Sequence, residues 1–600
     1  MDVEKIIAQD IAEAFHQLYQ YKLPENEIKL QPTRKEFAGS HTFVVFPYAR
    51  VAKKSPPDTA QEIGQYLKQQ SSIIKDYNVV KGFLNLELGE AAWLQVLKHI
   101  LSPTDGKAYG FAEPQDKKVM VEFSSPNTNK PLHLGHLRNN FLGDSVARIL
   151  LASGHEVRRV NLVNDRGIHI CKSMLAYERF GHGETPEEAG LKGDHLVGKY
   201  YVRFDQAYKQ EVEELKAQGI EEEQAKKEAP IIKAVQDMLQ KWEKGNEEVT
   251  QLWKKMNGWV YEGFDQTYRS IDVRFDKIYH ESETYLLGKN IVEEGLEKGV
   301  FYRKDDGSVW IDLSEDGLDE KLVLRADGTS VYMTQDLGTA DLRYQDYPFD
   351  DSVYVVGNEQ DYHFKVLFLI MKKLGRSYAD GLHHLSYGMV DLPSGKMKSR
   401  EGTVVDADDL IRETIETARE LTMKQGKIET LTPSQAEELF RMLGIGALKY
   451  FLLKIDPRKR MMFDPQESVQ FYGNTAPFIQ YTHARISAIL RKATEMQLNL
   501  DDTAVLDAQE SLKPSEREVI RILEEFPQKV IQAAEEYAPS VIAQYAYDLA
   551  KEYNRFYTEV SIFKEEKNDK MHFRVVFSKA VAQTIKNAMG LLGIEVPERM

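Results

Sequence analysis

Residues 118–140 read KVMVEFSSPNTNKPLHLGHLRNN and combine three kinds of local pattern. The apolar run at 118–123 is typical of a buried strand, and the turn-forming residues at 124–131 predict a loop. Residues 133–155 repeat apolar side chains at helical spacing, and VRRVNLV at 157–163 predicts the next strand. This β-α-β order predicts a parallel sheet with a helix packed against it.

The length and composition are those of a multidomain globular protein. At about 150 residues per domain, 600 residues predict roughly four structural units. Hydrophobic residues make up 42% of the chain and charged residues 29%, which excludes a disordered, collagenous or membrane-embedded protein. The opening segment MDVEKIIAQDIAEAFHQLY has the spacing of an amphipathic helix and lacks the build of a signal peptide. We therefore expect a cytoplasmic protein with no membrane partner.

Charge and cysteine content limit the possible partners and metals. The 94 acidic and 78 basic residues give a net charge of −16, which argues against a non-specific coat on nucleic acid. Docking of one folded RNA on local basic patches remains compatible with it. Cys171 is the only cysteine, so a multi-cysteine zinc site is excluded and a reducing compartment is indicated. Adjacent side chains such as His383 and His384 rarely converge on one ion, and we predict no metal ligands from the chain.

The composition and the predicted secondary structure change several times along the chain. Residues 1–110 read as a small α/β unit, and residues 111–405 read as the parallel-sheet unit, with a charged helical insertion at about 181–260. Residues 406–460 read as a helical junction, and residues 461–600 as an all-helical domain. The predicted fold class is therefore α/β plus α. Further strand signals are HTFVVF (41–46), GFLNLEL (82–88), VWIDL (309–313), VYMT (331–334) and SVYVVG (352–357).

The motif His133-Leu134-Gly135-His136 opens the helix predicted after the first strand and loop. Free backbone N–H groups and the positive end of the helix dipole make a helix start a natural phosphate site. A glycine there allows a nucleotide to approach the backbone closely. Two imidazoles three residues apart lie on the same side of the first turn, and both can donate hydrogen bonds to phosphate oxygens. The motif therefore favours nucleotide binding.

A second candidate is the cationic, glycine-flanked run GKMKSREG at 395–402. Such a loop can close on a polyphosphate and bring lysine to the transferring or leaving group, although the same pattern also fits an exposed basic turn. In this order and separation, the two motifs resemble the paired signatures of class I aminoacyl-tRNA synthetases. The resemblance implies an enzyme whose ATP-binding residues are His133, Gly135, His136, Lys396, Met397, Lys398 and Ser399.

Other segments resemble arginyl-tRNA synthetases in particular, and the resemblance covers nearly the whole chain. It implies a Rossmann-type parallel-sheet catalytic domain, a tRNA-binding amino-terminal domain at 1–110, a helical anticodon-binding domain at 461–600, and a monomer. The segments are VEFSSPNTNKPLHLGHLRNN (121–140), VNDRGIHI (163–170), VYMTQDLGTADLRY (331–344), VVGNEQDYHF (355–364), GMVDLPSGKMKSREGTVV (388–405), FYGNTAPFIQYTHARI (471–486) and PERM (597–600).

The resemblance also implies which residues bind arginine. A guanidinium group needs carboxylates and neutral acceptors around its planar fork. Tyr332 and Asp336 are four residues apart, share one face if they lie on a helix, and match the positions that hold the arginine side chain. A surface pair is the alternative interpretation, and a strand-edge charge is the alternative for Glu122. The other matched positions are Glu122, Asn127, His133 and Gln360.

The second signature departs from the family pattern. Lys398 and Ser399 stand where the family has serine and then lysine, so the lysine that meets pyrophosphate is displaced by one residue. Family members that lack this lysine often carry one just before the first signature, and Lys130 stands three residues before His133. We hypothesise that Lys130 and Lys396 share the phosphate charge, with Lys398 or Arg400 assisting. His133, His136, Lys396 and Lys130 are thus the predicted catalytic residues.

The implied reaction has two steps. The carboxylate of L-arginine attacks the α-phosphate of ATP, and the 2′-hydroxyl of the terminal adenosine of tRNA(Arg) then takes the arginyl group. Such a reaction needs positioning and charge stabilisation more than a protein nucleophile, and Mg²⁺ would arrive with the ATP. The resemblance further implies that activation requires bound tRNA.

Residues 471–486 combine stacking rings with hydrogen-bond donors, as recognition of single-stranded RNA requires. Rings spaced along a helix are also typical of a packed core. The predicted tRNA-binding residues are Asn474, Gln480, Tyr481, His483 and Arg485.

Three alternatives remain open at this point. Another class I synthetase would keep the fold and change the amino acid. A small nucleotidyltransferase with the HxGH motif would leave both terminal domains unexplained. A non-catalytic tRNA-binding relative would not need His133, His136 and Lys396.

Overall fold

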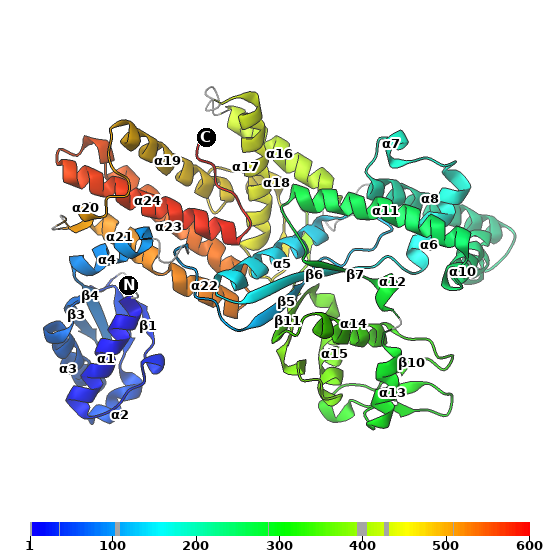
Figure 1. Cartoon of the computed structure of the whole chain (residues 1–600), viewed down its shortest axis with the longest axis horizontal. Coiled ribbons are helices and arrows are strands. Elements are labelled where there is room, and N and C mark those ends of the chain that lie inside the picture. The colour runs from blue at the N-terminus through cyan, green and yellow to red at the C-terminus, as the bar shows by residue number, and fades with distance from the viewer. Residues whose placement is uncertain are drawn as a thin grey trace.

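A computed structural model of the chain describes residues 3–34, 36–102, 108–285, 287–392, 405–424, 431–507, 509 and 511–600. Figure 1 shows a small amino-terminal unit in blue at one end and a parallel sheet near the middle. A helical carboxyl-terminal domain in orange and red lies above the amino-terminal unit, and inserted helices occupy the opposite end. The sheet therefore lies between the helical domain and the insertion.

The amino-terminal unit is an antiparallel sheet covered by helices. Its strand order is β1-β2-β4-β3. The predicted amphipathic helix is confirmed as α1, because Val3, Ile7, Ile11 and Phe15 recur at helical spacing and are buried. The elements are α1 (Val3–Tyr19), β1 (Leu30–Pro32), β2 (His41–Val44), α2 (Ala49–Ala52), α3 (Pro56–Gln70), β3 (Ile74–Val80), β4 (Phe83–Leu88) and α4 (Glu90–Leu101).

The central sheet has the strand order β12-β11-β5-β6-β7, and each neighbouring pair runs parallel. The predicted β-α-β unit is confirmed as β5, α5 and β6. Its elements are β5 (Lys118–Glu122), α5 (Leu134–Ala152), β6 (Glu156–Val163), β7 (Lys277–His280), β11 (Asp351–Gly357), α15 (Asp361–Lys373) and β12 (Leu382–Tyr387).

The order of the strands reverses beside β5. From β5 the chain extends the sheet through β6 and β7, whereas β11 and β12 extend it on the other side. In open parallel sheets, ligands bind beyond the carboxyl ends of the strands at such a reversal. The residues that follow β5 and β11 are therefore in the position expected of a binding site.

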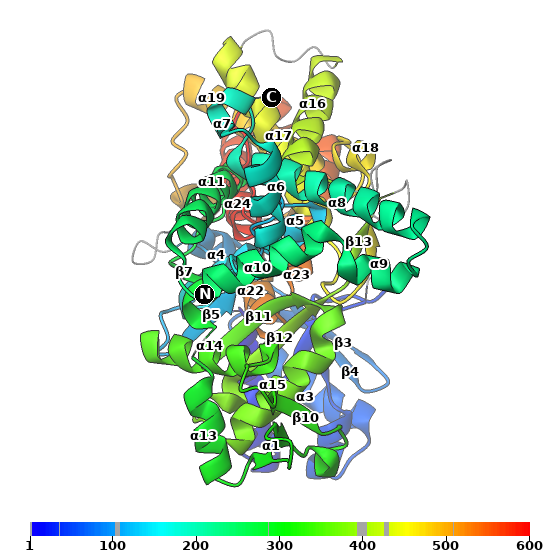
Figure 2. The same ribbon diagram turned by 90° about the vertical axis from the view of Figure 1, so that its right-hand side faces the viewer.

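The charged segment between β6 and β7 folds into helices, which face the viewer in Figure 2 between α16 above and α14 and α15 below. The predominance of Glu, Lys and Gln on these helices reflects their exposed faces, since many of these residues are exposed. The helices of this segment are α6 (Ile168–Phe180), α7 (Pro186–Ala189), α8 (Gly193–Ala217), α9 (Glu222–Glu228), α10 (Pro230–Glu243) and α11 (Glu247–Ser270). Helices α14 (Tyr332–Asp346) and α16 (Ala407–Lys424) follow β7 in the sequence.

Two strand predictions beyond the insertion have different outcomes. The strand at 309–313 is confirmed as β9 (Val309–Ile311), but it lies in a small antiparallel sheet with β8 (Tyr302–Arg303) and β10 (Lys321–Leu324). The strand predicted at 331–334 is wrong, because α14 begins there. The aromatic and β-branched residues of VYMT mimic a strand, and the helical spacing of buried Leu337 and Ala340 appears only in a longer window. Two short helices precede these elements, α12 (Glu281–Thr284) and α13 (Lys289–Glu297).

The carboxyl-terminal region is helical, as predicted, apart from a two-residue strand β14 (Met461–Met462) that pairs with β13 (Val390–Asp391). It packs on the central unit, where Ser145 Oγ in α5 donates to the Leu591 carbonyl at 2.9 Å. Its helices are α17 (Pro433–Leu453), α18 (Pro465–Ser468), α19 (Ala476–Glu495), α20 (Ala504–Asp507), α21 (Pro514–Glu524), α22 (Phe526–Glu535), α23 (Pro539–Glu559) and α24 (Asn568–Leu591).

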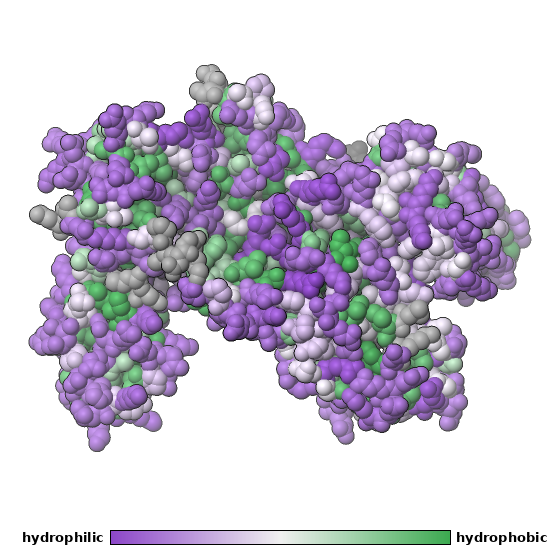
Figure 3. All heavy atoms as spheres, in the orientation of Figure 1, coloured by the Kyte–Doolittle hydropathy of each residue, from purple (hydrophilic) through white to green (hydrophobic). Residues whose placement is uncertain are grey.

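The surface in Figure 3 is largely hydrophilic, with small green patches over the central unit. Within the described residues, no helix has both the length and the apolar content that crossing a membrane requires. Cys171 is buried in α6.

Candidate active site

The HLGH motif forms the start of α5, and a loop joins it to the carboxyl end of β5. His133 is the N-cap residue and has an extended backbone. Its Nδ1 accepts a hydrogen bond from the Gly135 N–H at 3.1 Å, and the His133 N–H donates to Nδ1 of His136 at 3.1 Å. The two rings lie with their centroids 3.8 Å apart. The histidines therefore cap the helix and fix each other's position.

These contacts set the proton positions on both rings. A neutral imidazole carries one donor and one acceptor nitrogen, and each Nδ1 here accepts from the backbone. The proton of each ring is consequently on Nε2, which leaves both Nε2–H groups as donors. Burial, with a contribution from the positive charge of Lys130, lowers the pKa of His133 to about 4. Burial also holds the pKa of His136 well below its ordinary value, so both rings are neutral at pH 7.

Lys130 lies in the loop that leads into the motif and is half-buried. Burial lowers the pKa of its ammonium group. An anionic ligand near Lys130 would therefore meet a poorly hydrated cation, which strengthens an ion pair.

The residues that follow the second signature lie beside the first signature. Leu134 N donates to the Val405 carbonyl at 3.2 Å, and Ala407 N donates to the Leu132 carbonyl at 2.9 Å. His133 and Asp406 form an isolated antiparallel bridge. The predicted site residues Lys396, Met397, Lys398 and Ser399 and the assisting Arg400 lie outside the described residues, and the described chain resumes at Val405, which is hydrogen-bonded to the HLGH segment.

A cavity of about 440 Å³ opens next to the loop that precedes HLGH. It is lined by Asn127, Thr128 and Asn129 of that loop, by the start of α6, and by α12 and α14. Tyr332 and Asp336 of α14 contribute to it from one helical face, as predicted. Tyr332 is 76% exposed and is therefore available to a ligand.

The cavity contains a second carboxylate that sequence reasoning missed. Glu281 begins α12 immediately after β7 and lines the cavity with Asp336. Burial raises the pKa of Glu281 to about 7, opposed by Arg166 and reinforced by the charges of Asp165 and Asp336. A cation in the cavity would favour the ionised form. A strand assignment at 277–280 would have placed Glu281 at the carboxyl edge of the sheet, and this was the signal available in the sequence.

Glu122 and Gln360 take other positions. The Glu122 carboxylate is buried and forms an ion pair with Arg343 of α14, which is also buried. Because Arg343 neutralises this charge inside the protein, we do not base the guanidinium site on Glu122. Gln360 is exposed just beyond β11, at the carboxyl edge of the sheet.

The predicted RNA-contacting residues separate into two groups. Gln480 and His483 are buried: Gln480 Nε2 donates to the Glu595 carbonyl at 2.8 Å, and His483 Nδ1 lies 2.9 Å from the Pro597 carbonyl oxygen. These two side chains bind the backbone of the carboxyl-terminal segment. Buried side chains with such partners do not fit the predicted contact with RNA. Asn474, Tyr481 and Arg485 are half-buried.

Arg485 lies over the Tyr481 ring at 4.9 Å. Tyr472, in the loop before α19, is 71% exposed and offers a free ring face. An exposed ring of this kind suits base stacking.

Comparison with known proteins identifies the family. Residues 97–464, more than half of the chain, match the family described as tRNA synthetases class I (R), catalytic domain. The chain belongs to the arginyl-tRNA synthetase family. Residues 2–88 match the arginyl tRNA synthetase N terminal domain, and residues 479–600 match the DALR anticodon binding domain. The predicted family and fold class are thereby confirmed.

Individual relatives agree over their full lengths. A protein of Amoebophilus asiaticus named arginine–tRNA ligase is 57% identical, and one of Bacteroides thetaiotaomicron with the same name is 53% identical, each with complete coverage of both chains. The structure of Thermus thermophilus arginyl-tRNA synthetase has a TM-score of 0.80 and 25% identity, again with complete coverage of both chains. These matches across the whole chain exclude the small nucleotidyltransferase and the other class I synthetases considered above.

Proposed function

We propose that this chain is an ATP-dependent arginine–tRNA ligase, which activates L-arginine to arginyl-adenylate and transfers it to the 2′-hydroxyl of the terminal adenosine of tRNA(Arg). The observation that carries the proposal is the cavity next to HLGH, in which Asp336 and Glu281 face a common space with Tyr332. Two carboxylates and a phenol match the five donors and the flat face of a guanidinium group.

Arginine binds in this cavity with its side chain toward Asp336 and Glu281. The Asp336 carboxylate is oriented by His363, whose Nε2 lies 2.6 Å from Oδ2. The exposed Tyr332 ring packs beside the guanidinium plane. Asn127 lines the cavity from the loop between β5 and HLGH. It binds the end of arginine that carries the α-amino and carboxylate groups. Gln360, beyond β11, remains a candidate contact for the same end.

Adenylate formation uses the start of α5. The arginine carboxylate forms a bond to the α-phosphorus of ATP, and the bond from that phosphorus to the bridging oxygen of pyrophosphate breaks. The Nε2–H groups of His133 and His136 donate to the phosphate oxygens, and the backbone near Gly135 contributes the positive end of the helix dipole. Lys130 adds a cation, and Lys396 with Lys398 supplies charge from the second signature. Mg²⁺ accompanies ATP and is held mainly by its phosphates.

The tRNA binds over the terminal domains. Tyr472, Asn474, Tyr481 and Arg485 at the start of α19 form the proposed surface for unpaired anticodon bases. We further propose that the enzyme works in the cytoplasm as a monomer and that arginine activation requires bound tRNA.

The test is charging of total tRNA by the purified chain with each of the twenty amino acids and ATP. The proposal expects stable acid-precipitable product with arginine alone. Product with a different amino acid would contradict the assignment of the cavity. Binding of tRNA without any product would support the non-catalytic alternative.

A further inference from the structure

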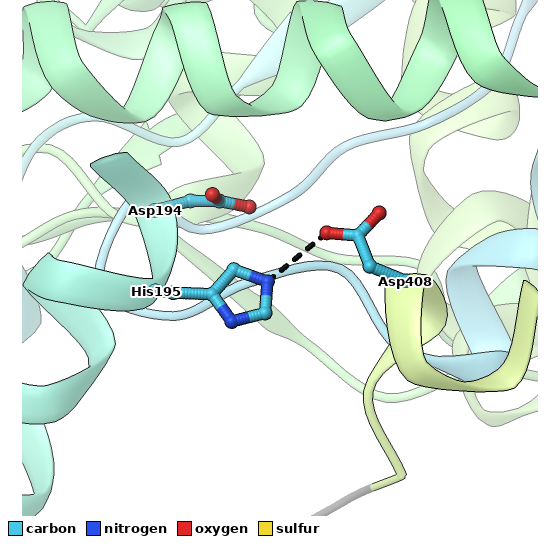
Figure 4. Close-up of side chains that lie close together, drawn as sticks. All are labelled: Asp194, His195 and Asp408. Carbon is cyan, nitrogen blue, oxygen red and sulfur yellow. Dashed lines mark hydrogen bonds and ion pairs between the residues drawn. The ribbon is translucent and has the colours of Figure 1, made fainter. Parts of the chain in front are cut away.

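Three side chains of the insertion converge on one carboxylate of α16, as Figure 4 shows for part of the group. His195 Nε2, in α8, lies 3.0 Å from Asp408 Oδ2, and Thr267 Oγ1, in α11, donates to Asp408 Oδ1 at 2.9 Å. Lys192 Nζ donates to Asp408 Oδ2 and lies 3.3 Å from Oδ2 of the buried Asp194. The insertion thus holds the first turn of α16 from two of its helices.

The same first turn is held by the nucleotide motif. Asp406 Oδ1 accepts hydrogen bonds from the N–H groups of Asp408 and Asp409 at 2.8 and 3.1 Å and so caps α16. On the other side, the backbone of residues 405–407 is hydrogen-bonded to residues 132–134 of the HLGH segment. Residues 405–408 are therefore held between HLGH and the insertion, and they follow the GKMKSREG segment closely in the sequence.

Helix α8 also packs closely on the loop before HLGH. A Cβ atom at Gly198 would lie 2.9 Å from Cδ of Pro131, so the absence of a side chain allows the approach. Helix α8 therefore contacts both the loop before HLGH and the start of α16.

The group does not need a metal ion to be stable. Asp194, His195 and Asp408 bring three possible ligand atoms within 4.8 Å of one another. The Lys192 ammonium is already bonded to Asp408 and paired with Asp194. An added divalent cation would have to displace or repel this ammonium group, so we interpret the group as an internal ion-pair cluster.

We propose that Lys192 and His195 are positioning residues for adenylate formation, which hold residues 405–408 against HLGH and so link the helical insertion to the ATP site. This inference rests on the proposed function. Because Lys192 and His195 hold Asp408, their loss should loosen residues 405–408 against the HLGH segment while leaving the arginine cavity intact.

The charges that face His195 set its pH response. Lys192, the N-cap of α8, and Asp194 in α8 face it from the insertion, and Asp406, just before α16, and Asp408 in α16 face it from the other side. The hydrogen bond to Asp408 raises the pKa of His195, against the effect of burial. Because the pKa of His195 is raised, the ion pair between protonated His195 and Asp408 is present at low pH. It weakens as pH rises through the pKa of His195.

The test compares Lys192→Met, Lys192→Arg and His195→Gln with Lys209→Met, a matched control on α8 whose ammonium is exposed and paired only with Asp205 among described residues. In ATP–pyrophosphate exchange with arginine and tRNA, Lys192→Met should raise the KM for ATP about tenfold and leave the KM for arginine within twofold. Lys192→Arg should restore most of the loss, and Lys209→Met should behave as wild type.

His195→Gln removes the imidazole that faces Asp406 and Asp408 but leaves Lys192 in place, and it gives a second variant in case Lys192→Met does not fold. It should raise the KM for ATP about threefold near pH 6, and this effect should decline as pH rises through the raised pKa of the wild-type histidine. Calorimetric titration with ATP alone should show the same ranking of affinities, whether or not the chain charges tRNA. An unchanged affinity for ATP in both variants, or equal losses for ATP and arginine, would overturn the inference. Absence of arginine exchange in the wild type would instead overturn the proposed function.

Discussion

Nε2 of His363 lies 2.6 Å from Oδ2 of Asp336, so a residue of α15 orients the carboxylate that α14 presents to the cavity. The two residues are 27 positions apart, and their helices precede and follow β11 in the sequence. The contact of Oδ2 with His363 fixes the orientation of the Asp336 carboxylate and leaves Oδ1 to a ligand. Such an oriented carboxylate is expected where a planar ligand must be bound.

The first prediction concerns Asp336. Asp336→Asn keeps the shape and removes the charge that the guanidinium group needs, so we expect kcat/KM for arginine to fall roughly 150-fold, about 3 kcal/mol. Exchange kinetics at varied arginine concentration measure it. Asp380→Asn, an exposed acid paired with Lys372, is the control. Equal kinetics for both variants would remove Asp336 from the site.

Glu281 predicts a pH dependence of arginine binding. Its pKa is raised to about 7, mainly by burial, and only the ionised carboxylate attracts a guanidinium group. Affinity for arginine should therefore rise about tenfold between pH 6 and pH 8, and binding at pH 6 should release close to one proton. Calorimetry in buffers of different ionisation enthalpy measures both quantities. Glu281→Gln should bind weakly with little dependence on pH, and a wild-type-like pH profile in this variant would contradict the assignment.

The two roles of His133 can be separated by substitution. Asn at position 133 can still cap α5 through its side-chain oxygen but lacks the Nε2–H donor. His133→Asn should lower kcat for exchange roughly 100- to 1000-fold, about 3 to 4 kcal/mol, with little change in melting temperature. His133→Ala should lose the same activity and, in addition, about 1 kcal/mol of stability. Activity retained in His133→Asn would mean that only capping matters.

Lys130 is the cation proposed to compensate for the displaced lysine of the second signature. Lys130→Ala should slow arginine activation by more than twofold, that is by more than about 0.4 kcal/mol, because the phosphate charge loses a half-buried partner. Single-turnover formation of the adenylate measures it. A change within twofold would assign the whole task to the lysines of the second signature.

The start of α19 offers a contrast between contact and packing. Tyr472→Ala should raise the KM for tRNA roughly five- to 150-fold, the range for loss of one stacked base, without lowering the melting temperature. Gln480→Ala should lower the melting temperature and leave the KM for tRNA unchanged, because it removes buried hydrogen bonds to the Glu595 and Met442 carbonyls and costs about 1 to 3 kcal/mol. Thermal unfolding and charging kinetics of both variants distinguish the roles.

The features that the sequence predicts best are those encoded locally. The apolar run of β5, the polar loop and the HLGH start of α5 follow each other along the chain, so their order alone predicts the parallel sheet and the helix start. Tyr332 and Asp336 were found through a family motif and share a helical face, although VYMT also mimicked a strand.

Features that depend on distant contacts escaped sequence reasoning. Glu122 forms an ion pair with Arg343, 221 residues away, and no local sequence pattern predicts that partner. Glu281 enters the cavity only because β7 ends beside the other strands. Gln480, Tyr481 and His483 are neighbours on α19. Gln480 and His483 are buried because the carboxyl-terminal segment covers them, and that contact is not visible in the local sequence.

The central claim is that the cavity and the HLGH motif together activate arginine. ATP–pyrophosphate exchange with each of the twenty amino acids, with and without total tRNA, tests it most directly. The account predicts exchange with arginine alone, and only when tRNA is present. Exchange with arginine in the absence of tRNA would keep the specificity and reject the dependence on tRNA. Exchange driven by any other amino acid would contradict the roles of Tyr332, Asp336 and Glu281.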